Sequence, residues 1–314
     1  MKHPEQIQKV YFIGIGGIGM SAIARYFNTQ GKEVYGYDRT RTVLTDKLEA
    51  EGMTIHYEDD IRFIPEGVDL VIFTPAVPQD HRELNYFRKH GYEVVKRSEA
   101  LGLLSAGCRS VAIAGTHGKT TTSSMTAHLL RQGGIDVSAF LGGIAADYDS
   151  NFLAGKSDWM VLEADEYDRS FLRLSPYFAA ILSMDADHLD IYGDDKSVSE
   201  GYRSFGAKVR DGGMLLLRND LIKGFSEREL RDLKDRDVEV LTFGDAHADI
   251  VIRNVHVENG KFVFDYCGLG HDFKTVELNL PGRHNVENAA VAITMALKCG
   301  VKEEDIRRAL SEFK

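Results

Sequence analysis

The sequence contains little cysteine, and it carries fewer basic than acidic side chains. Its cysteines are odd in number and far apart, at Cys108, Cys267 and Cys299. Neither a disulfide framework nor a zinc site is indicated, and a reducing compartment fits best. The 38 lysines and arginines are outnumbered by 48 aspartates and glutamates, which gives a formal net charge of −10. Broad attraction to nucleic acid or to anionic lipid is therefore not expected, although a local basic pocket for phosphates is compatible with this charge.

Long apolar runs are also missing. No uninterrupted apolar stretch approaches the roughly 18 residues that would suggest a membrane span, and the polar residues 1–9 lack the layout of a secretory signal. We therefore expect a cytoplasmic protein that acts on small molecules, without nucleic acid and without membrane insertion. Its 314 residues, 43% hydrophobic and 27% charged, suffice for two globular domains of about 100 to 200 residues each.

Apolar runs alternate with helix-forming stretches along the chain. Strands are predicted at residues 10–15, 33–37, 68–73, 111–114, 159–162, 178–182, 214–217, 238–243 and 250–257, and helices at residues 21–30, 98–108 and 285–298. Asn259 and Gly260 favour a hairpin turn, so antiparallel strands are expected late in the chain. The expected fold class is α/β, with a parallel-sheet domain over residues 1–107 and a second α/β domain over residues 108–314.

A first glycine-rich turn, Gly14–Gly19, follows the first predicted strand and opens a helix, and Asp38 ends the next strand. This pattern matches the dinucleotide fingerprint and is typical of a nicotinamide dehydrogenase. The fingerprint, however, requires only a diphosphate on a helix N-terminus and a carboxylate near a ribose. UDP-linked substrates satisfy it equally well.

A second glycine-rich segment, Gly115–Thr122 (GTHGKTTT), is a shortened variant of the phosphate-binding loop. Its glycines allow backbone N–H groups to converge on phosphate oxygens, and the following helix adds its positive end. Lys119 adds a full charge, and the Thr120 hydroxyl is suited to Mg²⁺. The alternative interpretation is a glycine-rich turn with an incidental lysine. The strand before it and the acidic strand ends that follow favour an ATP site.

Two acidic clusters follow predicted strands, at Glu163–Glu166 and Asp185–His188. Mg²⁺ prefers oxygen ligands, so Glu163 is the first choice beside a threonine hydroxyl and ATP phosphates. On spacing alone a structural role is favoured for His188. The remaining acids are interpreted as solvated loop residues or helix caps, without a catalytic role: Asp165, Glu166, Asp168 and Asp190.

In order along the chain, GTHGKTTT, the cluster EADE, the cluster DHLD and the segment Gly282–Asn288 (GRHNVEN) strongly resemble the Mur ligase family of peptidoglycan synthesis. The resemblance spans nearly the whole chain. Together with the turn GIGGIGMS at residues 14–21, it is greatest to the members that join L-alanine to UDP-N-acetylmuramate through an acyl phosphate. The resemblance implies a Rossmann-like UDP-binding domain, a P-loop-type central ATPase domain, and ATP and Mg²⁺ as cofactors.

The resemblance also implies roles for individual residues. Lys119, Glu163 and His188 would be catalytic, and Thr120, Glu163 and His188 would bind the metal, which reverses the structural interpretation of His188. ATP would be bound by Gly115, Thr116, His117, Gly118, Lys119, Thr120, Thr121, Asn285 and Asn288, the two asparagines contacting adenine. The UDP-sugar would be bound by Gly16, Gly17, Ile18, Gly19, Met20, Asp38 and Thr74.

Full-length members of the family carry a third domain, which this chain is expected to lack, and the chain alone is expected to be weakly active or inactive. Three alternative functions remain. Within the family, a recycling ligase attaches an intact tripeptide to the same UDP-sugar. Outside it, the first glycine turn would fit a nicotinamide-dependent oxidoreductase, and the two glycine-rich turns would fit a non-catalytic nucleotide-binding module.

Overall fold

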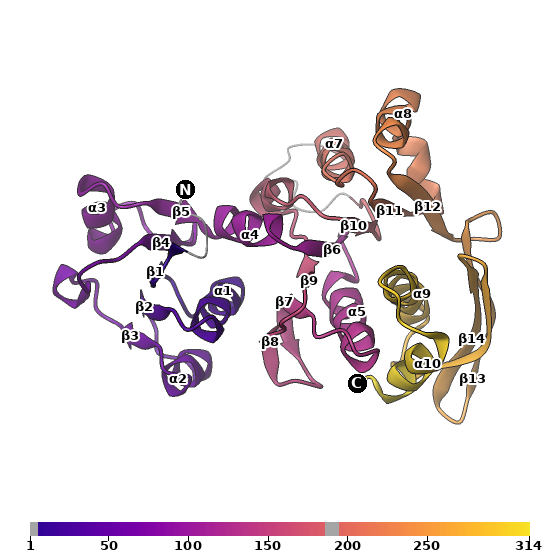
Figure 1. Cartoon of the computed structure of the whole chain (residues 1–314), viewed down its shortest axis with the longest axis horizontal. Coiled ribbons are helices and arrows are strands. Elements are labelled where there is room, and N and C mark those ends of the chain that lie inside the picture. The colour runs from indigo at the N-terminus through magenta and orange to yellow at the C-terminus, as the bar shows by residue number, and fades with distance from the viewer. Residues whose placement is uncertain (1–5, 186–194) are drawn as a thin grey trace. The chain divides into compact units, whose positions relative to one another are not determined.

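Two α/β units make up the computed structural model, which describes residues 6–185 and 195–314. The chain divides into the units Met1–Leu104 and Ser105–Lys314. Each unit has a sheet of its own with helices on both faces (Figure 1). The α/β class predicted from the sequence is confirmed, and the antiparallel strands are found late in the chain, as expected.

The sheet of the first unit is entirely parallel, with the strand order β3-β2-β1-β4-β5. Its strands are β1 (Lys9–Ile13), β2 (Glu33–Tyr37), β3 (Thr54–His56), β4 (Leu70–Phe73) and β5 (Val94–Lys96). Because β1 is the central strand and both faces of the sheet are covered, its side chains are buried on either side, and Tyr11, Phe12 and Ile13 are fully buried. The loops after β1, β2 and β4 therefore meet at one edge of the sheet.

Helices cover both faces of this sheet, with α1 and α2 on one side and α3 on the other (Figure 1). The helical segments are α1 (Ile18–Thr29), α2 (Val43–Ala50), η2 (Ile61–Phe63), α3 (Arg82–Lys89) and α4 (Arg97–Ala106). Gly17 caps α1 with an extended backbone, and Thr42 and Thr45 form a capping box at the start of α2. These caps fix where each helix begins at the carboxyl edge of the sheet.

In the described residues, the sheet of the second unit has ten strands in the order β15-β14-β13-β12-β11-β10-β6-β9-β7-β8. They are β6 (Arg109–Ala114), β7 (Ser138–Ala145), β8 (Ser150–Leu153), β9 (Trp159–Glu163), β10 (Phe178–Ile181), β11 (Met214–Arg218), β12 (Glu239–Gly244), β13 (Ile250–Glu258), β14 (Lys261–Gly268) and β15 (His271–Leu278). The seven neighbouring strands β13-β12-β11-β10-β6-β9-β7 all pair in parallel. At the two edges of the sheet, β8 pairs antiparallel with β7, and β14 pairs antiparallel with both β13 and β15. Asn259 and Gly260, both with positive φ, form the predicted turn between β13 and β14.

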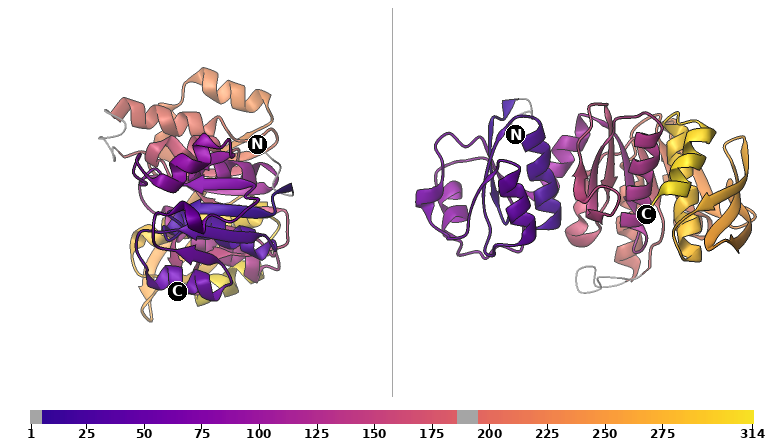
Figure 2. Two further views of the ribbon diagram at one scale, coloured as in Figure 1. Left: turned by 90° about the vertical axis from the view of Figure 1, so that its left-hand side faces the viewer. Right: turned by 90° about the horizontal axis from the view of Figure 1, so that it is seen from below.

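Three helices of the second unit, α5, α9 and α10, lie side by side on one face of its sheet, and α7 and α8 cover the other (Figures 1 and 2). The helical segments are α5 (Lys119–Gln132), η3 (Tyr167–Arg173), α7 (Asp195–Gly206), η4 (Asn219–Gly224), α8 (Glu227–Asp235), α9 (Arg283–Lys298) and α10 (Glu303–Glu312). No helix within residues 6–185 and 195–314 is long and apolar enough to span a membrane. The packing of α5 against α9 brings Gly118, the N-cap of α5, against Asn288 near the start of α9.

Candidate nucleotide-binding sites

A cavity of about 700 Å³ opens in the first unit where β1, β2 and β4 end. Such a crevice beyond the carboxyl ends of parallel strands is where α/β folds bind their ligands. Four of the residues that line the cavity were singled out by the sequence patterns: Gly14, Gly17, Asp38 and Thr74. The other lining residues were not: Tyr37, Arg39, Asp59, Ala76, Val77, Pro78, Asp80, His81 and Arg82. The lining carries both charged groups and apolar surface, as a pocket for a charged organic ligand requires.

The glycine turn is held at the rim of this cavity by backbone hydrogen bonds. The N–H groups of Gly14 and Ile15 donate to the Tyr37 carbonyl at 2.8 and 3.1 Å, and the N–H of Gly16 donates to Asp38 Oδ2 at 2.7 Å. Asp38 thus holds the turn as well as lining the cavity. A Cβ at Gly16 would lie 2.9 Å from Asp38 Oδ2, so the close approach requires glycine there.

The rest of the turn forms the first turn of α1. Ile18 begins the helix and is partly exposed, Gly19 lies against the guanidinium group of Arg97, and Met20 is buried in the core. The side chain of Met20 therefore does not line the cavity, and only its backbone belongs to the helix N-terminus. That terminus presents the positive end of a twelve-residue helix to the cavity rim.

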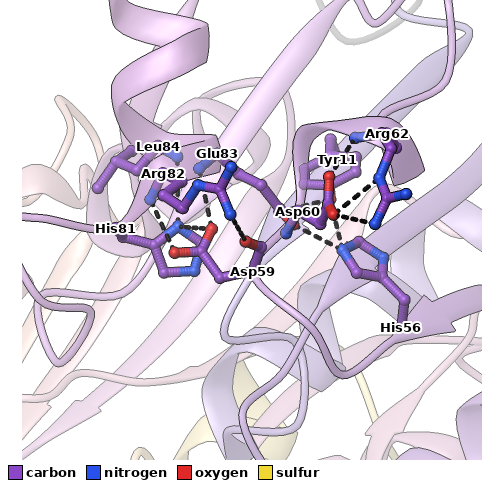
Figure 3. A network of polar contacts seen from close by, with 9 residues as sticks. All are labelled: Tyr11, His56, Asp59, Asp60, Arg62, His81, Arg82, Glu83 and Leu84. Atoms are coloured by element: carbon purple, nitrogen blue, oxygen red, sulfur yellow. Dashed lines mark hydrogen bonds and ion pairs between the residues drawn. The ribbon is translucent and has the colours of Figure 1, made fainter.

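A buried network of polar side chains underlies the wall of the cavity (Figure 3). Glu83 is fully buried, and it accepts hydrogen bonds from the Tyr11 hydroxyl at 2.6 Å and from the Asp60 N–H at 3.1 Å. The Nε2 atom of His56 lies 2.7 Å from the same carboxylate. Burial, with the adjacent Glu83 carboxylate, raises the pKa of Tyr11 and keeps it protonated as a donor. The network joins α3 to β1 and β3.

Asp59 connects this network to the cavity. Its carboxylate accepts the N–H groups of Arg82 and Glu83 at 2.8 and 3.0 Å, at the start of α3. Asp59, His81 and Glu83 also lie close enough together to be considered as a metal cluster. The carboxylate oxygens of Asp59 and Glu83 already accept protein N–H and O–H groups, and His81 Nδ1 accepts the Leu84 N–H, which argues for a structural network instead. No periodic pattern or motif in the sequence points to this network.

In the second unit, the segment Gly115–Gly118 links the end of β6 to the start of α5. Gly115 has φ of 141° and Gly118 has φ of 80°, conformations that favour glycine. The turn lies against the end of β10, where the His117 N–H donates to Ser183 Oγ at 3.1 Å and Thr116 Oγ1 donates to the Asp185 carbonyl at 3.1 Å. Thr121 follows in the first turn of α5. The geometry is that of a glycine-rich loop opening onto a helix N-terminus.

Lys119 makes a contact that corrects one sequence-based interpretation. Its Nζ donates to the Gly115 carbonyl at 2.7 Å and lies 3.0 and 2.9 Å from the two carboxylate oxygens of Glu166. Glu166 was expected to be a solvated loop residue or a helix cap. It stands at the N-cap position of η3, but its side chain makes no capping hydrogen bond there, and only 3% of the residue is exposed. The prediction of a solvated side chain was wrong because the chain after β9 folds back into η3, and this turn brings the carboxylate against the loop.

Glu163, at the end of β9, lies beside the same loop. It accepts the Gly142 N–H at 2.9 Å and a hydrogen bond from the Thr120 hydroxyl. Burial raises the pKa of Glu163, although the Thr120 and Gly142 hydrogen bonds and the charge of Lys119 oppose the rise. The structure thus brings together Lys119, Thr120 and Glu163, three of the expected site residues. His188 lies outside the described residues.

The two asparagines near the start of α9 also reach the loop. The side-chain oxygen of Asn288 would lie 2.7 Å from a Cβ at Gly118, so the two residues are in contact. Asn288 Nδ2 donates to Asn285 Oδ1 at 3.0 Å, and Asn285 Nδ2 donates to the Pro281 carbonyl at 2.6 Å. Both side chains are largely buried. The segments at residues 115–118, 163 and 285–288 therefore converge at one edge of the second unit.

Comparison with known proteins decides the family. Residues 9–109 match the Mur ligase family catalytic domain, and residues 113–296 match the Mur ligase middle domain. The chain belongs to the Mur ligase family. This Mur ligase chain is 45% identical to the UDP-N-acetylmuramate–L-alanine ligase of Christiangramia forsetii. The alignment covers 100% of this chain and 68% of that enzyme. The chain is 46% identical to the enzyme of the same name from Flavobacterium psychrophilum, covering 98% of this chain and 67% of that one.

Solved structures of Mur ligases share the fold. The UDP-N-acetylmuramate–alanine ligase of Thermotoga maritima aligns with a TM-score of 0.80 at 27% identity, covering 97% of this Mur ligase chain and 68% of that one. The Neisseria UDP-N-acetylmuramate:L-alanyl-γ-D-glutamyl-meso-diaminopimelate ligase aligns with a TM-score of 0.83 at 24% identity, covering 98% of each chain. The second likeness concerns the fold alone. The Mur ligase chain spans about two thirds of the length of the curated relatives named above.

Proposed function

We propose that this chain performs the ATP-dependent joining of L-alanine to UDP-N-acetylmuramate in peptidoglycan precursor synthesis. The observation that carries the proposal is the 45% identity, over the whole chain, to a ligase of that name. Each unit also has a glycine-rich turn at a helix N-terminus beside its own ligand-compatible groups. A ligase that activates one nucleotide-linked substrate with another nucleotide needs two such sites.

The UDP part of the sugar nucleotide is assigned to the cavity of the first unit. The N-terminus of α1, formed by Gly16, Gly17, Ile18, Gly19 and Met20, is suited to the diphosphate because its amides and helix dipole attract anions. Asp38 and Thr74 line the same cavity and are assigned to the ribose and its surroundings. Arg39 and Arg82 add positive charge to the lining. These roles agree with the polar and charged character of the wall.

ATP is assigned to the second unit. The loop residues Gly115, Thr116, His117, Gly118 and Thr121 would surround its phosphates, and Lys119 would supply a charge to the terminal phosphates. Asn285 and Asn288, which lie beside Gly118, are assigned to the adenosine side of the same site. The convergence of three separate segments on one loop supports this assignment.

Mg²⁺ fits the donor set of Thr120 and Glu163. A hydroxyl and a carboxylate are oxygen ligands of the type Mg²⁺ prefers, and the raised pKa of Glu163 indicates a buried carboxylate that a cation would stabilise. His188 is proposed as a further ligand on the resemblance alone. When bound, Mg²⁺ neutralises phosphate charge and orients the terminal phosphate.

The proposed reaction has two steps. First, a carboxylate oxygen of UDP-N-acetylmuramate attacks the γ-phosphorus of ATP, so that ADP leaves and an acyl phosphate forms. Next, the amine of L-alanine attacks the acyl carbon, phosphate leaves, and the nitrogen loses a proton to give the amide. Phosphoryl transfer depends on positioning and charge neutralisation, which Lys119 and the loop amides can provide without covalent participation.

The experiment is phosphate release by this chain with UDP-N-acetylmuramate, Mg²⁺-ATP and single amino acids. We expect release by this chain alone to be weak, to depend on L-alanine, and to be lower still with glycine, L-serine or the intact tripeptide. Preference for the tripeptide would favour a recycling ligase instead. Calorimetric binding of UDP-N-acetylmuramate to the same preparation separates weak turnover from loss of substrate binding. Absence of such binding would contradict the proposal.

A further inference from the structure

The ammonium group of Lys119 donates two hydrogen bonds to atoms of the protein itself. One reaches the Gly115 carbonyl at 2.7 Å, and the Glu166 carboxylate oxygens lie 3.0 and 2.9 Å away. The side chain of Lys119 is 15% exposed and that of Glu166 is 4% exposed. The pair is therefore largely shielded from water, where attraction between opposite charges is stronger than at the surface.

This pairing conflicts with phosphate binding. An ammonium group has three N–H donors, and both partners of Lys119 compete for them with the oxygens of a nucleotide. The Glu166 carboxylate also places a negative charge at the position where a negatively charged phosphate would approach Lys119. Phosphate oxygens therefore compete with Glu166 for the charge and the N–H donors of Lys119.

We infer that Glu166 is a positioning residue that holds Lys119 back from the phosphates and sets the affinity of the loop for the β- and γ-phosphates. The inference rests on the proposal that the loop binds ATP, and it goes beyond it by assigning a role to a residue outside the loop. Removal of the Glu166 charge frees the lysine and removes a repulsion. A purely structural Glu166 would act in the opposite direction, because its loss would disorder the lysine.

The test is nucleotide binding to Glu166→Gln, which keeps the shape of the side chain and removes its charge. We expect ADP and a non-hydrolysable ATP analogue, each with Mg²⁺, to bind about tenfold more tightly than to the wild-type chain, a change that corresponds to about 1.4 kcal/mol. The affinity for AMP should stay the same, because AMP lacks the phosphates that compete for Lys119. Calorimetry on the 314-residue chain measures all three.

Two variants control for charge and shape. Glu166→Asp keeps the charge on a shorter side chain and should remain near the wild-type affinity. Glu304→Gln removes one exposed negative charge from α10 and should leave nucleotide affinity unchanged. Unchanged or weaker binding of ADP to a folded Glu166→Gln variant would overturn the inference. If the wild-type chain bound neither ADP nor the ATP analogue, the ATP site itself would be refuted instead.

A measurement on the wild-type chain decides the case if Glu166→Gln fails to fold. The ¹⁵N resonance of the Lys119 ammonium group, assigned by its loss in Lys119→Arg, reports its partners directly. We expect this resonance to shift on addition of Mg²⁺-ADP and to stay in place with AMP. A Lys119 resonance that does not move when ADP binds would overturn the inference.

Discussion

The carboxylate of Glu163 accepts the backbone N–H of Gly142 at 2.9 Å, so a glycine in β7 helps to hold the proposed metal ligand at the end of β9. A Cβ at Gly142 would lie 2.3 to 2.5 Å from the carboxyl atoms of Glu163. No real Cβ tolerates that distance, and the carboxylate would have to move. The approach of these two strands thus fixes one side of the proposed magnesium site.

Gly142→Ala should therefore displace Glu163 and weaken the Mg²⁺-dependent part of nucleotide binding by about tenfold or more, since Mg²⁺ tolerates little change in ligand geometry. Gly143→Ala is the matched control, because a Cβ there would lie 3.4 Å from Thr120 Cγ2, close to ordinary contact. Titration of ATP with and without Mg²⁺ measures the effect. Equal behaviour of the two variants would show that Glu163 does not bind the metal from its present position.

A similar pair of glycines tests the first unit. Gly16→Ala would place a Cβ 2.8 Å from Thr45 and 2.9 Å from Asp38, whereas the nearest atom to a Cβ at Gly17 is 3.6 Å away. We expect Gly16→Ala to lose about tenfold or more in affinity for UDP-N-acetylmuramate, because the turn and Asp38 must separate. Gly17→Ala should bind within a factor of about three of wild type. Calorimetry measures both affinities. A greater loss of affinity in Gly17→Ala than in Gly16→Ala would contradict the proposed role of the contact between Gly16 and Asp38.

Lys119→Met should abolish measurable ATP binding while UDP-N-acetylmuramate still binds to the first unit. The substitution also leaves Glu166 buried without its cation, so the chain should lose about 2 kcal/mol or more of stability. The double variant Lys119→Met with Glu166→Gln should regain most of that stability and still not bind ATP. Thermal unfolding and calorimetry separate the two effects. Loss of both ligands from the stabilised double variant would indicate general misfolding.

Glu163 predicts a pH dependence of stability. Its folded pKa is raised by burial, so the folded chain binds this proton more tightly than the unfolded chain. The group therefore stabilises the fold below its unfolded pKa, and that contribution is lost as the pH rises through the folded pKa. Without Mg²⁺, Glu163→Gln should gain stability relative to wild type at pH 7 but not at pH 4. Thermal unfolding of both proteins at pH 7 and pH 4 measures the difference in stability. The same difference at both pH values would contradict a raised pKa of Glu163.

The sequence predicted those parts of the molecule that depend on local signals. Both turns could be recognised from their glycines, because Gly14, Gly115 and Gly118 have positive φ angles that favour glycine. The strand before each turn is a continuous apolar run, typical of a strand buried on both faces. Glu163 was predicted as a metal ligand because a carboxylate at the end of a buried strand lies at the edge of a parallel sheet where ligands bind. The structure places it beside Thr120, as that prediction requires.

Residues held by tertiary packing could not be found in this way. Glu166 follows Glu163 by three positions, and no spacing rule distinguishes a buried ion pair with Lys119 from an exposed loop carboxylate. The buried network of Tyr11, His56 and Glu83 joins segments up to 72 residues apart. Short strands such as β3 and β5 carry only three residues each, too few for a periodic signal.

The most direct test of the central claim is a calorimetric titration of the 314-residue chain with UDP-N-acetylmuramate and, separately, with NADH. The cavity of the first unit is proposed to hold a UDP-sugar, so UDP-N-acetylmuramate should bind at one site per chain and Gly16→Ala should weaken it, while NADH should not compete. Tight binding of NADH together with no binding of UDP-N-acetylmuramate would contradict the account.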